Sequence, residues 1–359
     1  MEWPVLVDSL DVLGVSAVPT TLLIDEAGVV RRIQPKPGDL ESFLATKPVA
    51  PSEQGAATKD PPSGKPRAHP GGTKGQSVTA LQARADALTT WGGPAQLSQA
   101  IDIYQQVLRK VPDRGPTHFR LGVAFCKRYE SSARHDGDFA AAIRQWRRAL
   151  DIDPNQYIWR RRIQQFGPRL DKPYPFYDWV TRARDAIGAR GEVPPRLAVE
   201  PRGAEIAQPS RTLPTNGGSD IDPDPRGAVT RDLRGLVQVE IVQVASTDPA
   251  DRAERVHVVF RPNTRLGAHW NHEADHLRLW VDPPPGWRVD RRLHTAPAVV
   301  AESSTESRRI EFEVRWSAGT AAGVVAIPAH ALYDVCEDVD GTCVYRRHDL
   351  KIRVTVPAD

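Results

Sequence analysis

The stretch that decides the fold of the central region is AIDIYQQVLRKVPD, residues 100–113, because its pattern recurs further along the chain. The second copy is AIRQWRRALDIDPN, residues 142–155. The matching pairs are Ala100/Ala142, Tyr104/Trp146, Leu108/Leu150 and Pro112/Pro154, all at one offset. Apolar residues that recur at helical spacing predict two equivalent amphipathic helices, each ended by its proline.

The order small residue, aromatic, leucine and proline resembles the second helix of a tetratricopeptide repeat. A first helix is expected at HFRLGVAFCKRY, residues 118–129, and flanking helices at 80–93, 157–167 and 176–187. The resemblance implies an all-α, repeat-containing domain over residues 77–187. Its groove would bind a peptide or another protein.

This region is also rich in arginines that lie near aromatic residues: Arg144, Arg147, Arg148, Arg160, Arg161 and Arg162. Arginines beside aromatic rings could bind an acidic or nucleic-acid partner. The alternative is a solvated helix face with Trp146 and Trp159 packed inside, and we favour it and expect no nucleic-acid partner. Cys126, on an apolar helical stripe, is expected to be a small buried apolar residue.

Two segments rich in Pro, Gly and small residues divide the chain. Residues 46–76 predict a disordered linker, and residues 188–234 predict a second, Pro/Gly-rich linker. The remaining parts are residues 1–45, the helical region 77–187 and a final region, 235–359.

The first part contains LGVSAVPTTLLIDEAGVVRRI, residues 13–33. This stretch resembles the second half of a thioredoxin-like domain of the TlpA/ResA and AhpC/TSA redoxin families. The resemblance implies a partial α/β domain over residues 1–45, in which Pro19 is a cis proline. By the same resemblance Val18, Pro19 and Thr20 would contact a substrate peptide.

Thioredoxin chemistry needs a cysteine thiolate as nucleophile, and no cysteine precedes Cys126. The Cys-x-x-Cys half of such a domain would lie upstream of residue 1, so we expect the chain to be N-terminally truncated. The alternatives are a decayed structural remnant and an ordinary α/β piece with an accidental Val-Pro-Thr.

The final part alternates apolar and polar residues in runs such as LVQVEIVQV, RVHVVFRP and LKIRVTV. This period predicts an all-β sandwich domain over residues 235–359. Near its end, Cys336 and Cys343 flank an Asp/Gly turn. The stretch ALYDVCEDVDGTCVYRRHDL resembles the last hairpin of the immunoglobulin-like amino-terminal domain of the disulfide-interchange protein DsbD.

That resemblance implies that Cys336 and Cys343 are a redox pair that exchanges with protein thiol or disulfide partners. The alternative is a structural disulfide, which would stabilise the domain by about 2.5 kcal/mol through loop entropy. Both require an oxidising compartment, so we expect a periplasmic or extracytoplasmic location. The leading functional hypothesis is a thiol–disulfide oxidoreductase with a protein-interaction module, and the rival is a non-enzymatic scaffold.

The sequence carries 40% hydrophobic residues, a net charge of +3 and three cysteines, and it has no apolar run long enough for a membrane span. His269, His272 and His276 could hold zinc, but they lie in a run that joins strands, and we expect no metal. Asp220, Asp222 and Asp224 begin like a calcium loop, but the Gly and Glu that such a loop needs are missing. Walker and GxSxG motifs are absent from the sequence, and we expect no cofactor.

Overall fold

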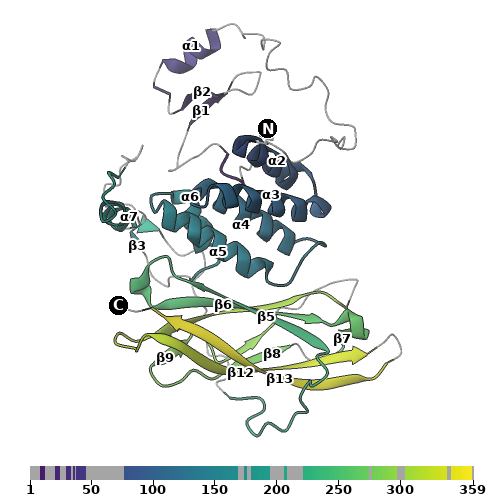
Figure 1. Ribbon diagram of the computed structural model, residues 1–359. Helices are drawn as coiled ribbons and strands as arrows, with labels where there is room; N and C mark the ends of the chain where they lie inside the picture. The colour runs from purple at the N-terminus through teal and green to yellow at the C-terminus, as the bar shows by residue number, and fades with distance from the viewer. Residues whose placement is uncertain are drawn as a thin grey trace.

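The computed structural model describes residues 9–12, 21–24, 30–33, 35–36, 38–45, 77–168, 174–175, 179–194, 206–207, 221–274, 277–296, 304–337 and 341–357. The fold of these residues combines helices with antiparallel sheets, as the multidomain prediction required. Figure 1 shows the helices stacked on one face of a β-sandwich, with the elements of residues 22–45 beyond them. None of the described helices has the length and apolar character that crossing a membrane requires.

The amino-terminal elements are two short strands and one short helix. Strand β1 (Leu22–Ile24) pairs antiparallel with β2 (Val30–Ile33), and α1 (Asp39–Ala45) follows. Asp39 begins the helix and accepts a hydrogen bond from the Lys36 amide at 2.8 Å. All four residues of β2 are exposed, and α1 buries none of its residues, so these elements have little core of their own.

The central region is a series of antiparallel helices. Its elements are α2 (Val78–Trp91), a 3-10 turn η2 (Pro94–Gln96), α3 (Leu97–Lys110), α4 (Gly115–Tyr129), α5 (Asp138–Ile152) and α6 (Tyr157–Gln164). Helix α7 (Trp179–Gly188) follows, and two-residue strands β3 (Tyr174–Pro175) and β4 (Ile206–Ala207) pair with each other. Ser77 caps α2 through its side chain, while α3 and α5 end just before Pro112 and Pro154.

The repeated sequence positions are also equivalent in the structure. Ala100 and Ala142 are fully buried in α3 and α5, and so are the aromatic residues Tyr104 and Trp146. The Trp146 indole donates a hydrogen bond to the Phe119 carbonyl in the preceding helix at 3.1 Å. A Cβ at Gly122 would overlap with this indole, so the absence of a side chain on α4 lets the two helices approach.

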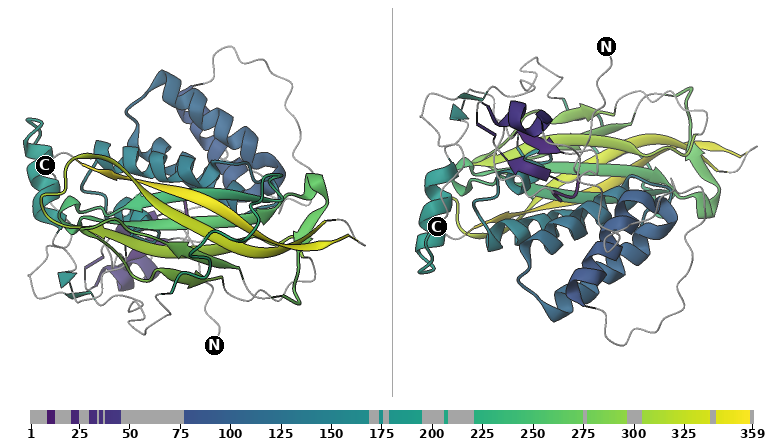
Figure 2. Two further views of the ribbon diagram at one scale, coloured as in Figure 1. Left: turned by 90° about the horizontal axis from the view of Figure 1, so that it is seen from below. Right: turned by 90° about the horizontal axis from the view of Figure 1, so that it is seen from above.

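Two sheets form the sandwich. One runs in the order β10 (Leu293–Thr295), β8 (Arg278–Val281), β12 (Gly323–Glu337) and β13 (Cys343–Val356), with β7 (Ala268–Trp270) also paired to β12. The other runs β5 (Val237–Ala245), β6 (Ala253–Pro262), β11 (Arg308–Trp316) and β9 (Trp287–Val289). Short 3-10 turns η3 (Pro249–Asp251) and η4 (Thr264–Leu266) flank β6. Figure 2 shows the long β12–β13 hairpin on the side away from the helices.

Strand β6 is buried on both of its faces. Val256, Val258 and Phe260 point into the core between the two sheets. Arg255 and His257, on the opposite face, are also buried, because the helices cover this sheet. The hydrophobic cluster of the helices correspondingly includes Val242 and Val244 of β5. The helices and the sandwich therefore share a packed interface.

Residues 221–234 belong to the expected second linker, yet they lie along the sandwich. The Asp232 amide donates to the Arg347 carbonyl at 2.8 Å, and the Arg347 amide donates to the Thr230 carbonyl at 3.0 Å. Asp224 binds the Arg347 guanidinium at 2.8 Å. This segment thus covers the edge of β13, which would otherwise present unpaired backbone groups.

Candidate functional site

The two cysteines at the end of the chain form a disulfide bond between β12 and β13. Cys336 and Cys343 are direct register partners, with their Cα atoms 3.9 Å apart. Cys336 is 4% exposed, whereas Cys343 is exposed at the start of β13. An attacking thiolate would therefore approach the bond from the Cys343 side.

The neighbours of the disulfide are polar. His269 of β7 is the register partner of Cys336 on the other side of β12. Its Nδ1 atom lies 3.3 Å from the Gly267 carbonyl oxygen. Next to Cys336, Glu337 forms an ion pair of 2.6 Å with Arg234. The bond lies beside the turn of the β12–β13 hairpin, and this position is compatible with either exchange or a structural role.

Cys126 does not belong to this site. It lies in α4 and is 8% exposed. Burial, and then the nearby Glu130 carboxylate, raise the pKa of Cys126 to about 12. The thiol therefore stays protonated at neutral pH and has little nucleophilic character.

The other residues singled out in the sequence lie elsewhere or beyond the described residues. Val18, Pro19 and Thr20, the expected substrate-binding residues, fall outside the described part of the chain, as do Asp220 and His276. In the part described, no group of three or more His, Cys, Asp or Glu side chains is arranged to hold a metal. Nε2 of His272 lies 3.3 Å from the Glu306 carboxylate instead.

Asp222 and Asp224 have a structural role. Asp222 lies 3.2 Å from Nε2 of His330 on the outer side of β12. Burial alone would raise the pKa of Asp224, but hydrogen bonds from Arg347 and two backbone amides outweigh it and hold the pKa below its usual range. These two carboxylates fix residues 221–234 to the sheet.

A site that the sequence did not indicate lies across helices α2, α4 and α6. Leu10, from the amino-terminal end of the chain, is 3% exposed and joins the hydrophobic cluster of the helices. Arg120 of α4 donates from Nε to the Leu10 carbonyl at 3.1 Å and from Nη2 to the Asp11 carbonyl at 3.5 Å. Trp159 of α6 donates from its indole to the Asp11 carboxylate at 3.0 Å. A short turn of the chain, residues 9–12, is thus held through both its backbone and its side chains, and we call the surface that holds it the α2/α4/α6 groove.

A network of hydrogen bonds orients Arg120 in this groove. Asp86 of α2 accepts a 2.8 Å bond from Arg120 Nη1 on one carboxylate oxygen. Its other oxygen accepts bonds from Gln82 and from the Tyr104 hydroxyl, each at 2.8 Å. Since Asp86 fixes one side of the guanidinium, the remaining donors face the carbonyls of the bound segment.

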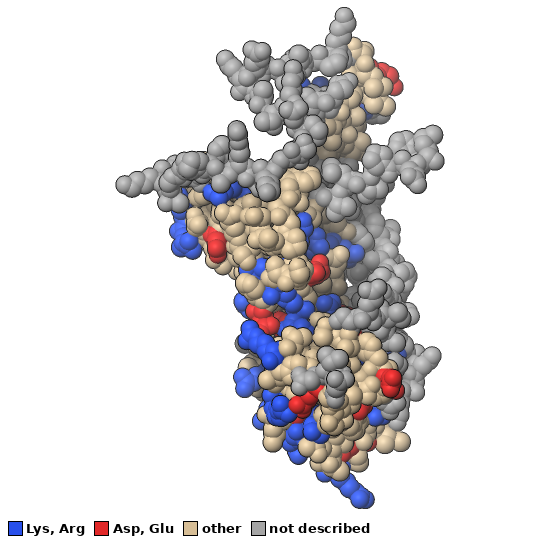
Figure 3. Space-filling model, turned by 90° about the vertical axis from the view of Figure 1, so that its right-hand side faces the viewer, with Lys and Arg blue, Asp and Glu red and all other residues tan. Residues whose placement is uncertain are grey.

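The junction between the helices and the sandwich is strongly charged. Arg134, in the loop before α5, forms an ion pair of 3.2 Å with Glu240 of β5, and Arg261 of β6 binds Asp136 at 2.7 Å. Figure 3 shows Lys and Arg side chains mixed with acidic ones along this boundary. These pairs attach the loop to the sheet.

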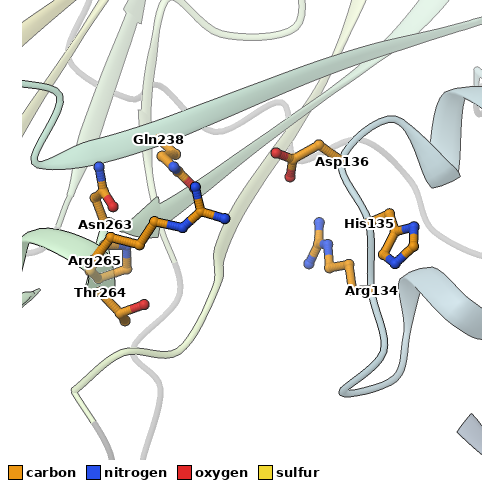
Figure 4. Close-up of a pocket in the computed structure, with 8 residues that line it drawn as sticks. Arg134, His135, Asp136, Gln238, Asn263, Thr264 and Arg265 are labelled. Carbon is orange, nitrogen blue, oxygen red and sulfur yellow. The ribbon is translucent and has the colours of Figure 1, made fainter. Parts of the chain in front are cut away.

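A polar cavity of about 520 Å³ opens at this junction. Figure 4 shows Arg265 extending from the sandwich side, while Arg134, His135 and Asp136 come from the loop on the opposite side. The cavity is exposed to solvent at His135 and Asp136. Its lining offers both charges, so it does not by itself define a ligand.

Beneath the helices, buried charges are paired on the outer face of the sheet. Arg255 binds Glu311 at 2.6 Å, and His257 Nδ1 lies 3.3 Å from the same carboxylate. Burial alone would raise the pKa of Glu311, but the hydrogen bonds from His257 and Arg255 outweigh it and hold that pKa far below its usual range. Glu311 therefore remains ionised and anchors the Arg255 and His257 side chains.

Sequence reasoning missed the α2/α4/α6 groove because Leu10 and Arg120 lie 110 positions apart. The sequence did not indicate the covered sheet face either, since Arg255 and His257 alternate with apolar residues in β6. Such alternation is typical of a strand with one face in solvent, whereas these two residues are buried under the helices.

Comparison with known proteins gives little further guidance. No protein-family model and no curated relative matches the sequence. Among solved structures, the crystal structure of BslA, described as a bacterial hydrophobin, shows a similarity that covers 33% of this chain and 94% of the BslA chain. The sequence identity is 10% and the TM-score 0.16, so this likeness supports no statement about fold or function.

Proposed function

We propose that this chain is an extracytoplasmic binding protein whose helices hold a short polypeptide segment in the α2/α4/α6 groove. The observation that carries the proposal is the contact of Arg120 with two successive carbonyls, those of Leu10 and Asp11. Side chains that donate hydrogen bonds to backbone carbonyls can bind any segment that places its carbonyls in the same positions. The resemblance of the helices to tetratricopeptide repeats implies the same role.

The surrounding contacts support a preformed groove. Asp86 fixes Arg120, and the far side of the helices is attached to the sandwich through pairs such as Arg134–Glu240. A surface that is rigid before binding loses less conformational entropy when it takes up a ligand. In this proposal the sandwich is the base of the helices, and its Cys336–Cys343 disulfide stabilises that base in an oxidising compartment.

Selection of a random octapeptide library on the full-length protein tests this function. We expect enriched peptides whose affinity falls at least about tenfold in Arg120→Ala, because two backbone contacts are lost. Trp159→Phe, which removes the indole donor and keeps an aromatic ring, is the second variant. Arg148→Ala, an exposed arginine paired with Asp113, is the control. An absence of enriched peptides, or peptides that bind all variants equally, would contradict the proposal.

Thiol–disulfide exchange at Cys336 and Cys343 is the second candidate function, favoured by the exposure of Cys343 beside a buried Cys336. A partner thiolate would attack the Cys343 sulfur and form a mixed disulfide, while the electron pair of the broken bond leaves on the Cys336 sulfur. The partner's second thiol would then release Cys343 and close the partner's own disulfide, so the chain gains the two electrons that the partner loses.

Reduction by a thioredoxin-like dithiol donor tests the exchange. Reacted protein is quenched with an alkylating reagent and its mass is measured over time. If exchange occurs, a stoichiometric amount of the donor should reduce the disulfide in the folded protein, so that the alkylating reagent labels both Cys336 and Cys343. If the disulfide is reduced only by a strong reductant in the presence of denaturant, exchange is excluded and the structural role remains.

A further inference from the structure

We infer that the chain's own residues 9–12 occupy the α2/α4/α6 groove as an internal competitor, and that its external partner carries the same chemistry, a large aliphatic residue followed by an acidic one. This inference rests on the proposed function and specifies the ligand of the same site. Residues 9–12 have the sequence Ser-Leu-Asp-Val.

The aliphatic preference follows from the burial of Leu10. Its side chain is 3% exposed, although it comes from a segment remote in sequence from the helices it contacts. Burying a leucine side chain from water is favourable, and a smaller side chain would gain less because it removes less apolar area from water. The groove thus selects a bulky apolar side chain at this position.

The acidic preference follows from the partners of Asp11. Its carboxylate accepts the Trp159 indole hydrogen bond at 3.0 Å, and the Arg120 guanidinium lies at its carbonyl. Asp11 also has a positive φ of 51°, a conformation that Asp and Asn tolerate better than most residues. The backbone therefore suits Asp or Asn, and the side chain favours Asp because a charged carboxylate oxygen accepts the indole hydrogen bond more strongly than a neutral amide oxygen.

Attachment to the same chain makes the segment an effective competitor. A tethered ligand has an effective concentration in the millimolar range, so a free peptide of equal intrinsic affinity must displace it. Weakening the internal segment should consequently strengthen the binding of an added peptide. This increase in peptide affinity distinguishes competition from a merely structural contact, because weakening a structural contact would not make an added peptide bind more tightly.

The test uses a fluorescein-labelled peptide with the sequence VDSLDVLG, residues 7–14, and measures anisotropy against the full-length protein. We expect Leu10→Ala and Asp11→Asn variants to bind the peptide at least about tenfold more tightly than the unmodified protein. Asp11→Asn retains the side-chain size and the tolerance for positive φ, so it remains informative if Leu10→Ala unfolds. Val193→Ala, an exposed residue after α7, is the control and should bind like the unmodified protein.

Two peptide controls check the chemistry. Replacing the peptide's own Leu by Ala, or its Asp by Asn, should weaken binding to the Asp11→Asn protein. Equal affinity for the unmodified protein and the variants would overturn the internal competition. If library-selected peptides bind in an Arg120-dependent manner but VDSLDVLG does not bind any variant, this inference fails and the proposed function stands. If no peptide binds at all, both fail.

Discussion

Nε2 of His257, in the middle of strand β6, lies 2.7 Å from the carbonyl oxygen of Phe166, just beyond the end of α6. The Phe166 ring also packs against Trp146 and Phe139, so this carbonyl belongs to the core of the helices. On its other side, His257 faces Glu311 of β11. One imidazole thus connects the helices with the charged outer face of the sheet.

Replacement of His257 by Ala should weaken this connection. The buried Phe166 carbonyl would lose its donor, and Glu311 would lose one of its partners, so we expect a loss of about 2 kcal/mol in the free energy of unfolding. Urea unfolding followed by tryptophan fluorescence measures the change. His135→Ala, in the exposed loop before α5, is the matched control and should leave the midpoint unchanged. An unchanged midpoint for His257→Ala would mean that the connection contributes nothing.

The close approach of α4 and α5 gives a second prediction. Gly122→Ala would place a methyl group against the Trp146 indole, which is fully buried and cannot move away without breaking its bond to Phe119. We expect a destabilisation of about 1–3 kcal/mol, as for other overpacked cores. Gly188→Ala, at a position with no neighbouring atom within 4 Å, should change stability little. Equal stability of the two variants in a thermal melt would contradict the prediction.

Local pattern was enough to predict the regular elements of the central and final regions. The repeat pairs Tyr104/Trp146 and Ala100/Ala142 are buried in helices α3 and α5, as their period required. Alternation predicted strands such as β5 and β13 for the same reason. The proximity of Cys336 and Cys343 also followed from a short turn between two strands, and they form a disulfide.

Contacts between distant segments could not be read in this way. Nothing near Leu10 marks it as a residue buried against helices more than a hundred positions away. Asp222 and Asp224 lie in a segment rich in Pro and Gly, whose composition predicts a linker. The Asp224–Arg347 ion pair and the contact of Asp222 with His330 fix this segment to the sandwich. The resemblances to thioredoxin-like, tetratricopeptide and DsbD domains remain predictions, as does the role of Val18, Pro19 and Thr20.

The third prediction concerns Cys126. Because burial raises the pKa of its thiol to about 12, we expect iodoacetamide at pH 8 to leave the folded protein unlabelled at this position. Unfolding in guanidinium without reductant should add one label, since Cys336 and Cys343 are held in their disulfide. Mass spectrometry of the intact protein counts the labels. Rapid labelling of Cys126 in the folded state would show that the thiol is accessible and ionised.

The last prediction is a dependence of stability on pH that arises at the helix–sandwich junction. Glu254 of β6 is 6% exposed, and burial raises its pKa to about 7, although the nearby Arg147 opposes this shift. Its folded-state pKa exceeds the ordinary value of 4.5, so between these values the folded protein holds a proton that the unfolded chain has released. Stability from this group is therefore fully present below about pH 4.5 and is lost as the pH rises through about 7.

Glu254→Gln, which cannot ionise, removes this dependence. We expect the variant to match the unmodified protein near pH 4.5 and to exceed it at pH 8, by up to about 3 kcal/mol if the whole shift is expressed. Urea unfolding at a series of pH values gives the difference between the two proteins, in which the contributions of all other titrating groups cancel. Glu273→Gln, on an exposed loop, should retain the pH profile of the unmodified protein. If the difference between the Glu254→Gln variant and the unmodified protein stayed constant across this range, Glu254 would titrate outside it, and Arg147 would be keeping the carboxylate charged.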